Sequence, residues 1–167
     1  KGVPKKNIKL FNGVPLLVHS ILYAQSSELI NRIIVTTDSD EISDIALSYN
    51  SEIINRPKEI SGDEATTESA IEHALDEINV KPDIIVLLQP TSPLRPEGSL
   101  QEAIKIFMDK NYDSLLSISP THKFFWQISE GEIAPKYNYL NRPRRQDLKE
   151  TEISYIENGS LYLFSYQ

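Results

Sequence analysis

The segment Leu87-Leu88-Gln89-Pro90-Thr91-Ser92-Pro93-Leu94-Arg95 joins the end of an apolar run to a short polar loop. The run, Ile84 to Leu88, stops at an amide side chain, and a run of this length is typical of a strand buried on both faces of a parallel sheet. Ligands of open α/β sheets bind just beyond the carboxyl ends of such strands. We therefore expect a site in this loop. Its candidate side chains are those of Gln89, Thr91, Ser92 and Arg95. A plain strand-to-helix connection with a solvated arginine is the alternative.

Short strands and helices are expected to alternate along most of the chain. The expected strands are Arg32–Thr37, Glu52–Asn55, Ile84–Leu88 and Ser114–Ser119. The expected helices are Val14–Ser26, Asp40–Tyr49, Thr67–Glu77 and Glu97–Asp109. Such alternation indicates βαβ units on a parallel sheet, so we predict an α/β fold.

The pattern changes after Pro120. Residues 121–150 are aromatic, basic and proline-containing, and they show no helical period. The residues around Gly131 favour a hairpin, and a further strand is expected from about Ser160 to Ser165. We interpret 121–150 as an excursion from a single domain that covers residues 1–167, acting as a lid or a subunit contact.

Composition excludes several classes of function. The 167 residues include 17 Lys and Arg against 24 Asp and Glu, a net charge of −7, so nucleic-acid binding is not expected as the main function. Cysteine is absent, which excludes disulfides and thiolate metal sites. No apolar run is long enough for a membrane span, and no signal peptide is evident. We expect a cytoplasmic protein.

Two basic clusters stand out on this acidic chain. Lys1-Gly2-Val3-Pro4-Lys5-Lys6-Asn7 is typical of the end of a glycine-containing phosphate loop, in which glycine permits close backbone approach and lysine supplies charge. Arg142-Pro143-Arg144-Arg145 is the second cluster. Both are candidates for binding phosphates or carboxylates, and solvated loops are the alternative.

Two other positions are candidates for ligand contact. Arg56 follows an expected strand, where it is placed to meet an anion. Thr67 opens an expected helix, where capping is the more frequent role of a threonine. His19 lies on the apolar side of a helix and is interpreted as structural. The sequence shows no nucleophile–histidine–acid arrangement and no cluster with metal-ligand spacing.

Segments spread along the chain resemble the acylneuraminate cytidylyltransferases, the synthetases of CMP-sialic acid and related nonulosonic acids. The matching segments are Lys1–Ile8, Val35–Asp38, Arg56-Pro57, Leu87–Arg95, Arg142–Asp147 and Glu157–Gly159. The resemblance implies a three-layer α/β/α nucleotide-diphospho-sugar transferase fold with a mostly parallel sheet. It also implies transfer of CMP from CTP to the anomeric hydroxyl of an acidic nine-carbon sugar, release of pyrophosphate, Mg²⁺ as cofactor, and a homodimer formed through residues 121–150.

The resemblance also assigns roles to residues. Those assigned to the nucleotide are Lys1, Lys6, Asn7, Arg56 and Thr67. Those assigned to the sugar are Gln89, Thr91, Ser92, Lys123 and Arg144. Lys6 and Asn7 are the candidate catalytic residues, because this reaction relies on positioning and charge neutralisation and not on a protein nucleophile.

The chain departs from the family pattern at three places. It begins inside the phosphate loop, and it ends before the family's paired metal-binding aspartates, so we expect the Mg²⁺ ligands outside this chain. Ile156 stands where many members have an arginine linked to the sugar carboxylate. The sugar, whether of sialic, legionaminic or pseudaminic type, therefore stays open.

Two alternatives remain beside the cytidylyltransferase interpretation. One is a non-catalytic nucleotide-binding or scaffold homologue that lacks the metal site. The other is an enzyme like the CMP-KDO synthetases, whose phosphate loop lacks the Lys5-Lys6-Asn7 pattern seen here.

Overall fold

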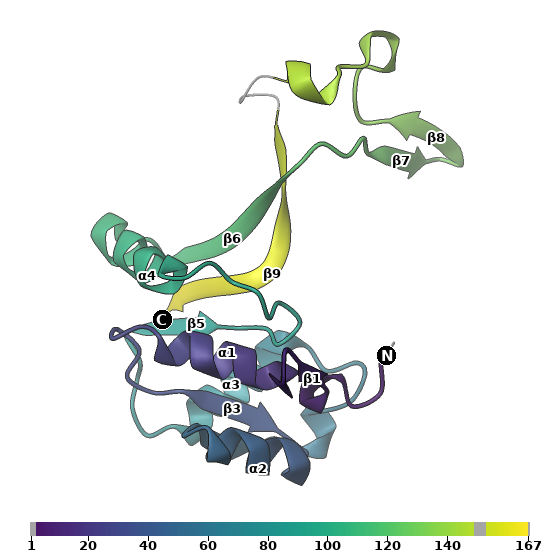
Figure 1. Cartoon of the computed structure of the whole chain (residues 1–167). Helices are drawn as coiled ribbons and strands as arrows, with labels where there is room; N and C mark the ends of the chain where they lie inside the picture. Colours follow the sequence, from purple (N-terminus) through teal and green to yellow (C-terminus); the bar gives the residue numbers. More distant parts are fainter. Residues whose placement is uncertain (1–2, 149–152, 167) are drawn as a thin grey trace. The chain divides into compact units, whose positions relative to one another are not determined.

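The computed structural model describes residues 3–148 and 153–166 and divides the chain into two compact units (Figure 1). The main unit comprises Lys1–Leu116 with Gly159–Gln167, and the hairpin unit comprises Ser117–Asn158. The expectation of a single domain over residues 1–167 stays a prediction.

The main unit contains the alternating elements that the sequence predicts. Its helices are α1 (Leu16–Gln25), α2 (Asp40–Ser48), α3 (Thr67–Glu77) and α4 (Ser99–Lys110), with short 3-10 helices η1 (Lys6–Ile8) and η2 (Lys58–Ile60). Its strands are β1 (Leu10–Phe11), β2 (Val14–Pro15), β3 (Ile34–Thr37), β4 (Glu52–Asn55) and β5 (Ile84–Leu87), and it shares β6 (Ser114–Thr121) and β9 (Ser154–Ser165) with the hairpin unit. The α/β class is confirmed. Within the described residues, no helix has the length and apolarity needed to cross a bilayer.

Strand pairing is mixed. β3 and β4 pair in parallel, with Val35 opposite Ile53. β5 pairs antiparallel with β9, and the strand order of that sheet is β5-β9-β6. The expectation of a parallel neighbour for β5 is wrong for this pairing, and its residues are half-buried instead of fully buried. An apolar run indicates burial but not direction, because partners of either direction pack against the same side chains.

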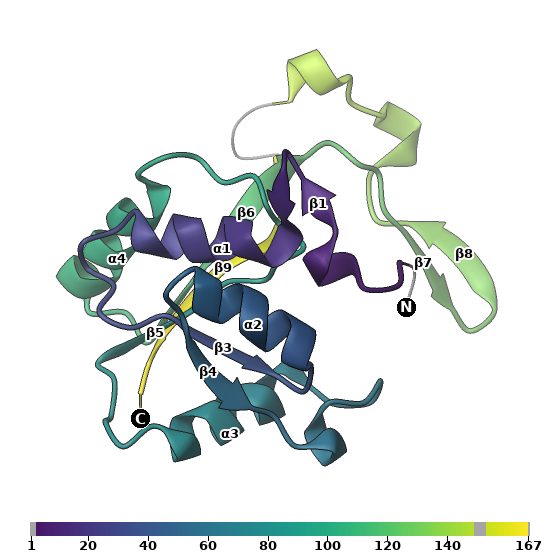
Figure 2. The ribbon, with the colours of Figure 1, turned by 60° about the horizontal axis from the view of Figure 1, so that its bottom comes forward.

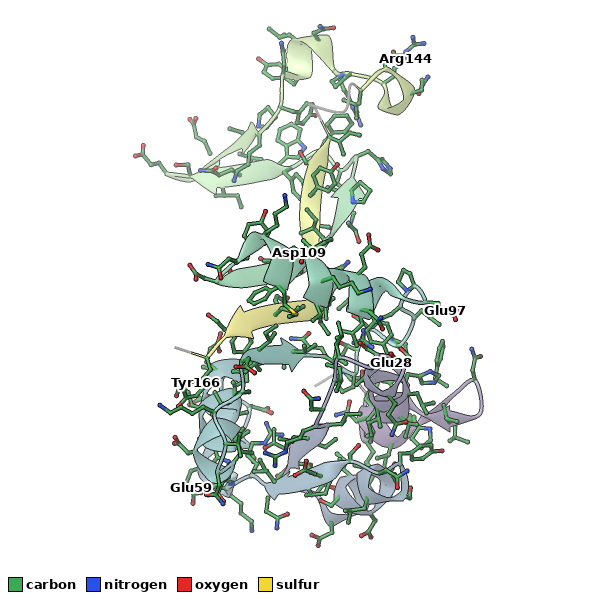
Figure 3. All side chains as sticks on the ribbon, turned by 90° about the vertical axis from the view of Figure 1, so that its left-hand side faces the viewer. Glu28, Glu59, Glu97, Asp109, Arg144 and Tyr166 are labelled. Carbon is green, nitrogen blue, oxygen red and sulfur yellow. The ribbon has the colours of Figure 1, made fainter. Side chains whose placement is uncertain are left out.

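Helices cover both faces of the strands. α1 and α2 lie side by side, and their buried residues Val18 and Ala46 belong to one cluster that also packs Val35 of β3 (Figure 2). α3 lies on the opposite side of β3 and β4 from α2 (Figures 1 and 3). A second cluster joins α4 to β9 through Phe107 and Leu163. The expected layered arrangement is therefore present in the main unit.

Side-chain caps fix where α2 and α3 begin. The Ser39 hydroxyl accepts a hydrogen bond from the Ile42 amide at 3.4 Å, and acidic residues occupy the first turn of α2, where they suit the helix dipole. The Thr66 hydroxyl accepts from the Ser69 amide at 3.1 Å and caps α3. The cap of α3 is thus Thr66, and Thr67 is the first helical residue.

A small hairpin precedes α1. Asn12 and Gly13 have φ values of 48° and 84°, and Phe11 lies opposite Val14, so the two residues form a tight turn between β1 and β2. The sequence predicted helix from Val14, whereas α1 begins at Leu16. His19 donates to the Phe11 carbonyl at 2.8 Å, which confirms its structural role.

The hairpin unit contains β7 (Trp126–Ser129) and β8 (Glu132–Pro135), joined by a turn at Glu130 and Gly131 with φ values of 53° and 83°. The expected hairpin is therefore confirmed. Short 3-10 helices at Tyr139–Asn141 (η3) and Arg145–Asp147 (η4) follow.

Polar and aromatic contacts hold the hairpin unit together. The Asn158 amide accepts from the Ser117 hydroxyl at 2.6 Å and donates to the Ser119 hydroxyl at 3.1 Å. The Arg142 guanidinium lies 4.3 Å from the centre of the Phe124 ring. Arg142 and Asn158 therefore make contacts inside this unit. They belong to two of the segments that carry the family resemblance, Arg142–Asp147 and Glu157–Gly159.

Replacing Leu163 by alanine should lower the free energy of unfolding by about 2–5 kcal/mol, because this side chain is 1% exposed within the α4–β9 cluster. The matched control is Leu47→Ala on α2, where the side chain is 55% exposed and the change should stay within about 0.5 kcal/mol. Urea unfolding followed by circular dichroism measures both. Similar losses in the two variants would contradict this core.

Candidate active site

A pocket of about 500 Å³ lies in the main unit and is lined by three separate segments. The segment around η1 contributes Val3, Lys5, Lys6, Asn7 and Ile8. The start of α2 contributes Ser39, Glu41 and Ile42, and the loop after β5 contributes Gln89, Pro90 and Thr91. The pocket thus brings together four sequence-predicted site residues, namely Lys6, Asn7, Gln89 and Thr91.

The backbone around η1 turns sharply to present its lysines. Lys5 has a left-handed backbone with a φ of 51°, and its carbonyl accepts from the Ile8 amide at 3.2 Å. The Lys5 ammonium donates to the Glu41 carboxylate at 2.6 Å, and this exposed pair links the loop to the first turn of α2. Within the described residues, Lys6 forms no ion pair. Its charge is therefore available to an anion in the pocket.

The start of α2 gives the pocket a second polar wall. The backbone amides in the first turn of a helix and the helix dipole both favour an anion. One of these amides, that of Ile42, already donates a hydrogen bond to the Ser39 hydroxyl. Glu41 adds a negative charge beside the two lysines. The pocket therefore combines two ammonium groups, a carboxylate and the neutral amides of Asn7 and Gln89.

The loop after β5 is held from inside the protein by Arg95. Its guanidinium donates to the Gln89 carbonyl at 2.9 Å, the Ser160 carbonyl at 3.0 Å and the Ser20 hydroxyl at 3.1 Å. Burial lowers the pKa of Arg95 from its usual value. Arg95 is thus neither a residue of this pocket nor a solvated arginine, which are the two roles that the sequence leaves open.

Other predicted nucleotide contacts lie outside the lining of this pocket. Arg56 is half-buried after β4, and its backbone amide donates to the Thr37 carbonyl at 2.9 Å. Thr67 is exposed in the first turn of α3. Lys1 lies outside the described residues.

Of the predicted sugar contacts, Ser92 does not line the pocket, and its amide donates to the Gln89 carbonyl at 3.2 Å. Lys123 and Arg144 belong to the hairpin unit. Lys123 is exposed, and the Arg144 guanidinium donates to Asp147 at 2.7 Å.

Ser39 and Glu41 are pocket residues that the sequence did not indicate as such. Both follow the carboxyl end of β3, which is parallel to β4, and this position is itself a signal for a site. The residues 3–148 and 153–166 contain no group of three histidines or acids that is able to hold a metal ion.

A family model described as cytidylyltransferase matches residues 1–157. The chain belongs to the cytidylyltransferase family. It is 35% identical to N-acylneuraminate cytidylyltransferase A of Danio rerio, over 97% of this chain and 38% of that protein. It is 30% identical to an N-acylneuraminate cytidylyltransferase of Escherichia coli, over 100% of this chain and 40% of that protein. The resemblance found in the sequence is confirmed.

Solved structures support the fold. A CMP:2-keto-3-deoxy-manno-octonic acid synthetase in complex with CTP superposes with a TM-score of 0.68 at 12% identity, covering 98% of this chain and 68% of that one. At this identity the likeness shows the nucleotidyltransferase fold alone. The chain spans 38% and 40% of the length of the two curated relatives.

Replacing Ser39 by alanine should lower the free energy of unfolding by about 1 kcal/mol, because the Ile42 amide loses its capping acceptor. The control is Ser48→Ala at the other end of α2, where the hydroxyl only donates to the Ile45 carbonyl and a change below about 0.5 kcal/mol is expected. Urea unfolding measures both variants, and an unchanged Ser39→Ala stability would refute the cap.

Proposed function

We propose that this chain is the nucleotide- and sugar-binding part of a cytidylyltransferase. The enzyme transfers CMP from CTP to the anomeric hydroxyl of an N-acylneuraminate or a related nonulosonic acid. The observation that carries the proposal is that one pocket is lined by Lys6 and Asn7 together with Gln89 and Thr91. Membership of the cytidylyltransferase family and the two N-acylneuraminate cytidylyltransferase relatives support it.

The nucleotide side of the proposed site is the η1 loop. A triphosphate carries several negative charges. Lys6 supplies a positive charge, and no acidic side chain among the described residues forms an ion pair with it. Asn7 offers an amide donor from the next position in η1. We assign Lys1, Arg56 and Thr67 to the nucleotide on the family resemblance.

The sugar side is the loop after β5. A neutral amide such as that of Gln89 suits hydroxyl and acylamino groups better than it suits phosphate, because it both donates and accepts hydrogen bonds. Thr91 and Ser92 shape the same loop. We assign Lys123 and Arg144 to the sugar on the family resemblance, and they are candidates for meeting its carboxylate where Ile156 replaces an arginine.

The proposed chemistry needs no covalent intermediate with the protein. The sugar oxygen attacks the α-phosphorus, the bond from that phosphorus to the bridging oxygen breaks, pyrophosphate leaves, and the hydroxyl proton is released. Lys6 and Asn7 stabilise negative charge that develops on the phosphates, which is the main requirement of phosphoryl and nucleotidyl transfer.

We extend the proposal to Mg²⁺ as cofactor on the family resemblance. No three histidines or acids gather among the described residues, so these residues alone do not complete a site for such an ion. We therefore assign no step through the metal.

We also propose a cytoplasmic homodimer formed through residues 121–150. Several large apolar side chains of the hairpin unit are exposed, and a second copy of this chain would cover them. They are Trp126, Ile128, Ile133, Tyr139 and Leu140, with exposures of 55%, 73%, 67%, 62% and 84%.

The natural full-length protein should release pyrophosphate from CTP when sialic, legionaminic or pseudaminic acid is supplied with Mg²⁺, and EDTA should stop the release. Lys6→Ala should lower kcat/KM by about 100-fold, since one charge-stabilising group is lost. Lys110→Ala, an exposed lysine on α4, is the control and should change it by less than about twofold.

Three outcomes would contradict this proposal. No release with any of the three sugars rejects the activity and favours a non-catalytic homologue, whereas release with an eight-carbon keto sugar alone favours the CMP-KDO type. Equal losses in Lys6→Ala and Lys110→Ala reject the phosphate-loop role of Lys6.

Ile128→Asp should convert the proposed dimer to a monomer, because it places a charge in an apolar contact. Light scattering coupled to size-exclusion chromatography should show the molar mass halved. Val80→Asp, at a 63% exposed position of the main unit, should leave the mass unchanged. A monomeric wild-type protein would reject the dimer.

A further inference from the structure

Gln89 lies where the β5–β9 ladder ends. Leu87, the last residue of β5, is opposite Tyr162. Because the pairing is antiparallel, continuing its register by two residues brings Gln89 level with Ser160, next to Gly159. β9 extends past this point, so its backbone at Gly159 lies beside the side chain of Gln89.

Arg95 connects the two backbones at this point. One guanidinium nitrogen of Arg95 donates to both the Gln89 carbonyl (2.9 Å) and the Ser160 carbonyl (3.0 Å). A second nitrogen donates to Ser20 of α1 at 3.1 Å, and the guanidinium carbon lies 5.1 Å from the Tyr23 ring centre. The guanidinium is planar and carries several N–H donors in fixed directions, so it makes all of these bonds at once. The single ammonium group of a lysine does not.

Gly159 provides the space that the Gln89 side chain occupies. A Cβ atom at Gly159 would lie 3.1 Å from the Gln89 Oε1 atom, closer than most real contacts of this kind. At Gly13, Gly62, Gly98 and Gly131 a Cβ would meet no atom within 4 Å. Gly159 thus differs from those four in the atom that lies beside it, whereas its positive φ of 66° is a property that it shares with Gly13, Gly98 and Gly131.

We propose that Arg95 and Gly159 are positioning residues that fix the direction of the Gln89 amide in the pocket, and thereby determine recognition of the sugar. We call this arrangement the Gln89 clamp. Arg95 holds the backbone of Gln89 against β9, and the missing side chain of Gly159 lets the Gln89 Oε1 atom approach the backbone of that strand. The proposal rests on the proposed function, in which Gln89 contacts the hydroxyl or acylamino groups of the sugar.

The kinetic test uses Gly159→Ala in the full-length protein. The added methyl group displaces Gln89 Oε1, so the KM for the sugar should rise about tenfold while the KM for CTP changes by less than about twofold. Gly98→Ala is the matched control, because it has a φ of +75° and open space around the added Cβ, and the sugar KM should not change. Equal effects of both variants on the sugar KM would overturn the clamp and leave backbone strain as the cause.

Double variants that include Gln89→Ala distinguish a positioning role of Arg95 and Gly159 from a general loss of stability. In a Gln89→Ala background, Gly159→Ala and Arg95→Lys should each cause no further rise of the sugar KM, because the group that they position is gone. Additive increases would overturn the proposal. Gly159→Asn serves if Gly159→Ala does not fold, since asparagine tolerates positive φ but still places a Cβ beside Gln89.

An inactive wild-type protein would reject the proposed function without deciding the clamp. Crystal structures of the wild-type protein and Gly159→Ala then decide it. A different direction of the Gln89 side chain in the variant supports the clamp, and an unchanged direction overturns it.

Discussion

The antiparallel pairing of β5 with β9 is the constraint on which the pocket depends. It joins a strand from the middle of the chain to one near its end, and the cluster of α4 with Leu163 packs against it. Arg95 extends this connection by two residues beyond the ladder, with bonds to the carbonyls of Gln89 and Ser160. Without that pairing, the loop that carries Gln89 and Thr91 would have no fixed backbone opposite it.

The pocket is lined by three segments, and local structure holds each of them in place. η1 turns on the left-handed Lys5, α2 starts at the Ser39 cap, and the loop after β5 is tied by Arg95. The Ser39 cap contributes about 1 kcal/mol, and the exposed Lys5–Glu41 ion pair contributes less than about 1 kcal/mol. Together they bring Lys6 and Gln89 to one cavity from positions far apart in the sequence.

Local signals made much of this predictable. The bounds of β4 and α3 agree with the sequence prediction, because polar turn residues flank each segment and side-chain periodicity is clear. The helix expected from Val14 begins at Leu16 instead, because Asn12-Gly13, a typical hairpin signal, forms the turn between β1 and β2. The direction of β5's partner and the inward bonds of Arg95 depend on contacts with β9, more than sixty residues away, which no local pattern specifies.

The Lys5–Glu41 pair has a consequence for turnover. Its carboxylate lines a pocket proposed to hold a polyphosphate and neutralises one of the two lysine charges there, so an anion in the pocket is attracted less strongly than by two unpaired lysines. A purely basic pocket would hold pyrophosphate tightly, and slow product release limits the rate of many enzymes. Under the proposed function, Glu41 therefore lowers the affinity of the pocket for the entering triphosphate and for the leaving pyrophosphate alike.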